Sequence, residues 1–244
     1  MKLNMVLAWT GLILAVVSGL AETGSGLGTR WGWWSFTSGF SVLTWATFCS
    51  LAAVVVSLGA FFLSRSETGQ QWVLLSIAGL ALALLASAIP LGWFVTARSA
   101  PLIHDITTDT DDPPRYVAVL PLRSGAINPV EYGGPAVAEL QHAAYPAITP
   151  LMLPLPKDRA YDLAMEAVHK MGWAVVAGDS SEGRIEATDS TFWFGFKDDI
   201  VVRIQPEGSG SRLDVRSLSR VGLSDVGTNA KRIRTYLALV RSMR

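Results

Sequence analysis

The sequence is poor in the residues from which most catalytic and redox sites are built. It has one cysteine and three histidines in 244 residues. A single cysteine, Cys49, excludes an intramolecular disulfide and a metal cluster of thiolates. The G-x-S-x-G and H-E-x-x-H motifs are absent, and so is the lysine-containing phosphate loop. These absences favour a protein that is not an enzyme and that carries no cofactor.

An excess of charge of either sign is also missing. Lys and Arg number 20, Asp and Glu number 20, and the formal net charge is zero. A nucleic-acid-binding protein needs a concentrated basic face to neutralise phosphates. We therefore expect no nucleic acid among the partners.

Ionisable residues are absent from three long apolar runs, Leu3–Ala21, Phe40–Leu63 and Trp72–Ala97. Each is close to the roughly 20 residues that a helix needs to cross a hydrocarbon core of about 30 Å. The runs predict three transmembrane helices. Because transporters and channels usually keep charged groups inside the bilayer, their absence argues against transport.

The residues around these runs fit a membrane protein. Trp31, Trp33 and Trp34 precede the second run, where indole rings favour the membrane interface. Gly79, Ala83 and Ser87 recur every four residues in the third run, which predicts close helix packing.

The amino terminus allows two interpretations. Lys2, the first apolar run and Ala21 fit either a signal peptide cleaved after Ala21 or an uncleaved first helix. If the signal peptide is cleaved, two spans remain and the carboxyl-terminal part lies outside. If the first helix is kept, three spans with an inside amino terminus also place that part outside. We expect the bacterial cytoplasmic membrane, with an extracytoplasmic domain.

Composition divides the chain into three segments. Residues 1–98 form the predicted anchor. Residues 99–155 are acidic and then proline-rich, since nine of the 12 prolines fall between Pro113 and Pro156, and they predict a linker with one short helix at Val137–Ala144. Residues 156–244 predict a soluble domain.

Hydrophobic periodicity predicts an α+β domain. Helical spacing of apolar residues covers Lys157–Met171 and Val226–Val240. Between them, alternating patterns predict strands in "WAVVA", "RIEAT", "TFWFGF", "IVVRIQ" and "RLDVRSLS". The expected fold is a helical transmembrane anchor followed by an antiparallel five-stranded meander that two helices cover on one face.

Four further blocks of the chain are distinctive: "IHDITTDTDDPP", "AYPAITPL", "GRIEATDSTFWFGFKDDIVVRI" and "DVRSLSRVGLSDVGTNAKRIR". They resemble the family of domain of unknown function 1499, and the resemblance covers roughly Pro101 to Arg241. Some relatives have an apolar amino-terminal half and others look like exported single domains. The resemblance implies an extracytoplasmic location and no established activity.

Carboxylates cluster just after the third apolar run. The candidate metal ligands there are His104, Asp105, Asp109 and Asp111. A calcium loop is not predicted, because the glycine and the closing glutamate of such a loop are missing. We favour a solvated linker and keep a metal-assisted hydrolase as the alternative.

A second candidate site combines the arginines of the last predicted strand with the start of the last helix. Arg216, Arg220, Asp225 and Asn229 are its members. Alternation places the arginines on one strand face, either as exposed charge pairs or as a surface that binds carboxylate or phosphate groups. The sequence thus predicts a membrane-anchored envelope protein whose domain binds a protein partner or an anionic or lipid-like ligand. It does not indicate an oligomeric state.

Overall fold

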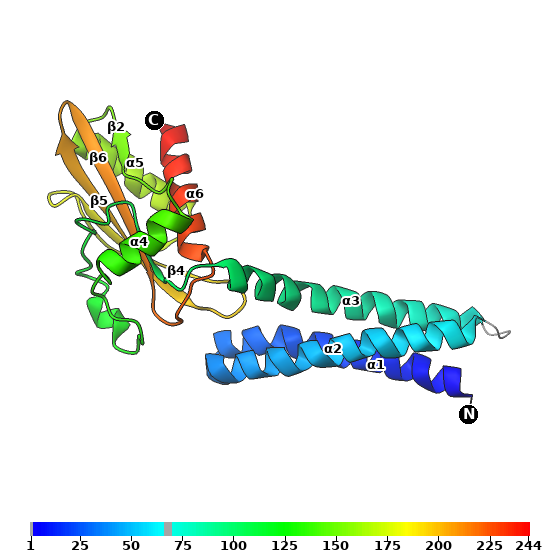
Figure 1. Cartoon of the computed structure of the whole chain (residues 1–244). Coiled ribbons are helices and arrows are strands. Elements are labelled where there is room, and N and C mark those ends of the chain that lie inside the picture. Colours follow the sequence, from blue (N-terminus) through cyan, green and yellow to red (C-terminus); the bar gives the residue numbers. More distant parts are fainter. Residues whose placement is uncertain (1, 66–69) are drawn as a thin grey trace. The chain divides into compact units, whose positions relative to one another are not determined.

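The computed structural model describes residues 2–65 and 70–244. The chain forms two compact units (Figure 1). The first holds the chain up to Arg98 together with the loop Phe192–Gly195, and the second holds Ser99–Thr191 and Phe196–Arg244.

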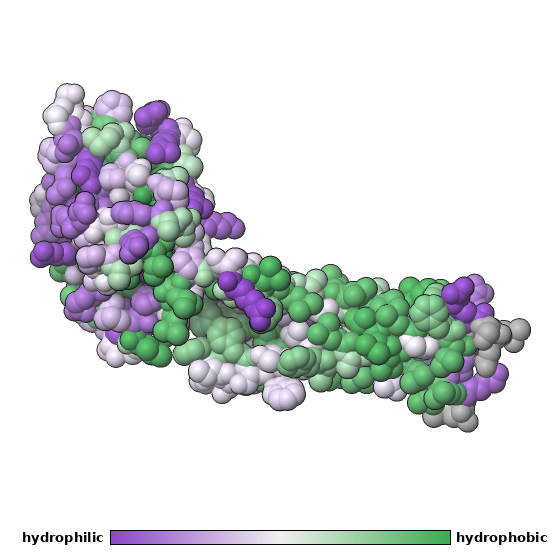
Figure 2. All heavy atoms as spheres, viewed as in Figure 1, coloured by the Kyte–Doolittle hydropathy of each residue, from purple (hydrophilic) through white to green (hydrophobic). Residues whose placement is uncertain are grey.

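The first unit contains three long helices, α1 (Leu3–Arg30), α2 (Phe36–Ser64) and α3 (Gln70–Ser99). All three are long and apolar enough to cross a membrane. Hydrophobic residues cover most of their visible surface (Figure 2). The prediction of three long apolar helices is confirmed.

Small residues form the interior of the helical unit. Ala15, Ala53 and Ala83 meet there, one from each helix. A Cβ atom added to Gly11 or to Gly79 would lie 2.4 or 2.8 Å from the hydroxyl oxygen of Ser57, so glycine lets the three helices approach closely.

Helix α1 is longer than the apolar run that predicted it. It continues past Ala21, the predicted cleavage position, to Arg30. Glu22 therefore lies inside α1, and only 4% of its surface is exposed. The apolar run itself contains no Asp, Glu, Lys, Arg or His, but the helix is longer than the run, because a hydropathy run ends at the first charge whereas helical geometry continues through it.

The second unit is built on a six-stranded antiparallel sheet. Its strands are β1 (Asp105–Thr107), β2 (Leu151–Leu153), β3 (Ala174–Asp179), β4 (Arg184–Ser190), β5 (Lys197–Glu207) and β6 (Gly210–Ser219). The order is β1-β6-β5-β4-β3, and β2 also pairs with β6. Strand β6 therefore pairs with three other strands, β1, β2 and β5.

Two helices cover one face of this sheet. They are α5 (Lys157–Lys170) and α6 (Thr228–Met243). Their apolar stripes pack on Ile185, Ile200, Val202 and Leu213 from the strands. Tyr236 of α6 is fully buried, and its hydroxyl donates to the carbonyl of Ala164, 2.9 Å away in α5. The α+β class and the two covering helices are confirmed.

The predicted strand "TFWFGF" is a loop instead. The N–H of Thr191 donates to the carbonyl of Phe196 over 2.9 Å, which closes the segment on itself. Gly195 has φ +68°, a left-handed conformation that interrupts a strand. The meander therefore has four strands, β3 to β6.

The proline-rich segment is part of the domain, and the predicted boundary at residue 156 is wrong. Strands β1 and β2 of this segment pair with β6, and it also contains the short 3-10 helix η1 (Leu120–Arg123) and helix α4 (Pro135–Ala144). The buried amide of Gln141 in α4 accepts from the N–H of Thr107 over 2.9 Å and donates to its carbonyl over 2.7 Å. A side chain thus completes the hydrogen bonding of β1.

Candidate functional site

The sheet face opposite α5 and α6 carries charged side chains that are buried. They include Asp199, Asp214 and Arg216, and the partly buried Arg203 lies on the same face. Tyr116 and Val119, in the coil between β1 and α4, pack over this face against Val201 and Leu218. The alternation of the arginines onto one face is as predicted, but the face is covered rather than exposed to solvent.

Arg216 is 3% exposed and lies at the centre of this covered face. Its Nε and Nη2 atoms donate to the two oxygens of Asp105 over 2.9 and 2.7 Å. The guanidinium also donates to the carbonyls of Pro114 and Val130 over 3.2 and 2.7 Å. Burial raises the pKa of Asp105, and the hydrogen bonds and charge of Arg216 oppose that rise. The guanidinium group of Arg216 therefore forms its hydrogen bonds within the domain.

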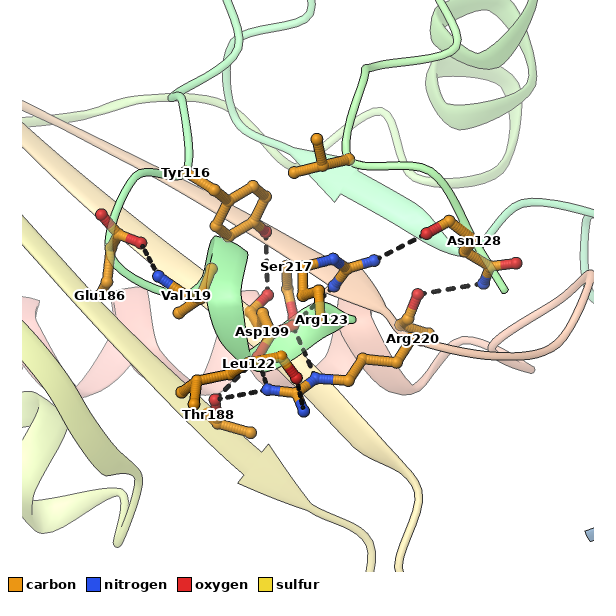
Figure 3. Close-up of polar contacts among 12 residues, drawn as sticks. Tyr116, Val119, Leu122, Arg123, Asn128, Glu186, Thr188, Asp199, Ser217 and Arg220 are labelled. Atoms are coloured by element: carbon orange, nitrogen blue, oxygen red, sulfur yellow. Dashed lines mark hydrogen bonds and ion pairs between the residues drawn. The ribbon is translucent and has the colours of Figure 1, made fainter. Parts of the chain in front are cut away.

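Asp199 joins two further arginines (Figure 3). Its carboxylate accepts from Arg123 over 2.6 Å and from Arg220 over 2.9 and 2.8 Å. It also accepts from the hydroxyl of Thr188 over 2.7 Å. Burial acts to raise the pKa of Asp199, but the hydrogen bonds from Arg220 and Thr188 outweigh it and the pKa is lowered.

On this face, a carboxylate of the protein accepts from three successive backbone N–H groups. Glu186 is fully buried. It accepts from the backbone nitrogens of Val117, Ala118 and Val119, at 3.0 to 3.1 Å. Such a cluster of N–H groups is an anion-binding concavity, and Glu186 supplies the anion.

Asp225 and Asn229 lie on the other side of the sheet from the Arg216 side chain. Asp225 accepts from the N–H groups of Gly227 and Asn229 over 2.9 and 2.6 Å, which caps the start of α6. Burial raises the pKa of Asp225. Asn229 is fully buried, and its side chain accepts from the hydroxyl of Ser217 over 2.6 Å. The four predicted surface residues therefore do not form one surface, and ligand binding by them stays a prediction.

The four candidate metal ligands are also dispersed. Asp105 pairs with Arg216, and Asp109 lies 3.0 Å from Arg203 and 2.6 Å from Arg212. His104 Nδ1 is 3.4 Å from the carbonyl of Leu223. Within residues 2–65 and 70–244, no three His, Cys, Asp or Glu side chains are grouped as metal ligands. The carboxylates of this segment mainly pair with arginines.

A pocket of about 580 Å³ lies between α4 and the segment that follows β1. Thr110, Asp111, Pro113, Tyr132, Gly134, Pro135, Ala138, Glu139 and His142 line it. The buried hydroxyl of Tyr132 has no hydrogen-bond partner in the described part of the chain. Burial, and then the charge of Asp105, raise the pKa of Tyr132 to about 12, so this hydroxyl is neutral at physiological pH.

Sequence reasoning missed this pocket, apart from Asp111, because its walls come from the supposed linker. One signal was present: Gly133 and Gly134 precede Pro135, and proline is favoured in the first turn of a helix. That signal predicts where α4 begins. It does not predict what α4 packs against.

These features define a class: a protein with three candidate membrane-spanning helices and an α+β domain whose second sheet face carries a buried ionic network. The chain belongs to the family described as protein of unknown function (DUF1499), whose model matches residues 105–240, more than half of its length. The match begins at β1, in agreement with the inclusion of the proline-rich segment in the domain. A comparison with curated proteins gives no match.

Proposed function

We propose that this protein is a membrane-anchored binding protein of the bacterial cell envelope. Helices α1 to α3 hold it in the cytoplasmic membrane, and the domain faces the extracytoplasmic side. The observation that carries the binding role is the pocket at α4. Its volume of about 580 Å³ lies within the range of small-molecule sites, roughly 300–1,000 Å³.

The pocket favours a ligand that carries an amine. Asp111 and Glu139 line it, and neither forms an ion pair with any residue that the structure describes. Two carboxylates attract a cation and repel an anion. The apolar surface of Pro113, Pro135 and Ala138 suits the hydrocarbon part of the same molecule.

An anionic ligand held by Arg216 and Arg220 has weaker support. Both guanidinium groups already donate to carboxylates and to backbone carbonyls, and such a ligand would have to displace those partners. An amine, by contrast, needs no bond in the domain to break. The amine belongs either to a lipid headgroup or to a soluble molecule. The membrane anchor would raise the effective concentration of lipid headgroups at the domain.

The test is native mass spectrometry of the full-length protein, purified from its own membrane in mild detergent. The Glu139→Lys variant reverses one charge of the pocket. Glu131→Lys makes the same change at an exposed position that does not line it. We expect an amine-bearing molecule to remain bound to the wild type and to the Glu131→Lys variant, and to be lost from Glu139→Lys.

The identity of the retained molecule distinguishes its sources, because a phospholipid amine and a soluble amine differ in mass. Equal retention by both variants would refute the pocket as the site. A metal ion that survives dialysis against a chelator, and that Asp109→Ala removes, would instead favour the hydrolase alternative.

A further inference from the structure

Glu22 is the only Asp or Glu in the described residues of α1, α2 and α3. It is 4% exposed, so its carboxyl group points into the helical unit rather than toward lipid or water. Its Oε1 atom has no hydrogen-bond partner in the part of the chain that the structure describes. Burying an acidic side chain among membrane helices is energetically unfavourable, so such a residue indicates a functional site.

The packing of the helices places Glu22 well inside the unit. It lies eight residues before Arg30, which is about 12 Å along the helix axis at 1.5 Å per residue. Its side chain interacts with that of Ser50, which is fully buried and lies ten residues inside the apolar run that starts at Phe40. The carboxyl group therefore lies within the apolar length of α2.

Four buried serines of the helical unit each donate their hydroxyl proton to a carbonyl of their own helix. These bonds run from Ser18 to Ala15, from Ser25 to Glu22, from Ser50 to Thr47 and from Ser87 to Ala83, at 3.2, 2.6, 2.9 and 2.9 Å. A hydroxyl has one proton to give, so each of these serines uses its proton within its own helix.

The surroundings of Glu22 favour the neutral form of its carboxyl group. The group is buried and its Oε1 atom has no hydrogen-bond partner among the described residues, so an ionised carboxylate there would lose most of its solvation. No cation offsets a negative charge there, since the basic residues described in this unit, Lys2, Arg30, Arg65 and Arg98, all lie at helix ends.

We propose that the helical unit contains a proton-binding site at Glu22, which holds its proton at neutral pH. The unit is then more than an anchor, because release of this proton requires that water or a donor enter the helix packing. Only the depth of Glu22 in a bilayer depends on the proposed membrane location of the helices. The burial of Glu22 among the helices does not depend on a bilayer.

Infrared difference spectroscopy tests the site directly. The full-length protein in phosphatidylcholine vesicles at neutral pH is compared with its Glu22→Gln variant. We expect the variant to lose the carbonyl band of a protonated carboxyl group. The control is Glu131→Gln, at an exposed position, which should lose only carboxylate bands.

Loss of carboxylate bands alone in Glu22→Gln would overturn the proposal, because it would show an ionised acid. The same measurement in detergent micelles separates the two proposals. A protonated carboxyl band in micelles supports the site even if the helices prove not to span a bilayer.

Discussion

Substitution of Arg216 by alanine should destabilise the domain rather than merely remove a ligand contact. The side chain is 3% exposed and forms a bidentate pair with Asp105 at 2.9 and 2.7 Å. Removing one partner of a buried ion pair leaves an uncompensated charge and costs about 3–5 kcal/mol. The carbonyls of Pro114 and Val130 also lose their donor.

Hydrogen exchange of the full-length protein in detergent measures this effect. Amides of β6 should exchange roughly two to three and a half orders of magnitude faster in Arg216→Ala, since each 1.4 kcal/mol is a factor of ten. The double variant with Asp105→Ala should cost less than the sum of the single variants, by up to about 3 kcal/mol. That difference measures the coupling within the pair.

An exposed pair of the same domain provides the control. Lys170 and Glu166 lie 2.8 Å apart on α5, with side chains 50% and 58% exposed. Glu166→Ala should therefore change stability by no more than about 0.5 kcal/mol. A loss below about 1 kcal/mol in Arg216→Ala, with no coupling to Asp105, would refute the structural role and leave the guanidinium available for a ligand.

Three other properties follow from the geometry. Gly183→Ala should lower stability by more than about 2 kcal/mol in urea unfolding, because a Cβ there would lie 2.2 Å from the carbonyl oxygen of Ile204 at a φ of +74°. Gly208→Ala, at φ +57° with no atom within 4 Å, should lose only about 1 kcal/mol. Glu186→Gln should cost about 1.5–3 kcal/mol by thermal unfolding, since the backbone N–H groups of residues 117–119 lose a charged acceptor. An unchanged melting temperature would contradict that role. Burial raises the pKa of all five tyrosines above 10, so their contribution to stability is complete below pH 10 and is lost as the pH rises through the folded values. Phenolate absorbance at pH 10 should accordingly be lower in the folded protein than in urea, and equal absorbance would count against this burial. The five are Tyr116, Tyr132, Tyr145, Tyr161 and Tyr236.

Periodicity was sufficient to predict the elements whose burial follows a regular pattern. Helix α5 buries Ala160, Ala164 and Ala167 at helical spacing, and β5 buries Ile200, Val202 and Ile204 in alternation. Such patterns arise because one side of the element faces a core. Helix α5 was predicted to within one residue of its observed end, whereas β5 extends beyond the predicted "IVVRIQ" on both sides.

Strands β1 and β2 could not be predicted in this way. Each is three residues long, so neither shows a period, and both exist because β6 supplies partners. The burial of Arg216 was missed for the same reason, since the covering segment is irregular coil. The loop at Phe194 was mistaken for a strand, because alternating phenylalanines imitate one and local sequence does not reveal where Gly195 turns the chain.

The central place of β6 determines when the domain can form during synthesis. Strand β6 spans Gly210–Ser219 and pairs with β1, β2 and β5. β1 leaves the ribosome about a hundred residues before its partner exists, so β1 and β2 have no strand to pair with until β6 has been synthesised. Pairing across such long separations folds slowly. A chain that ends before residue 219 should therefore lose the whole domain rather than its last strand.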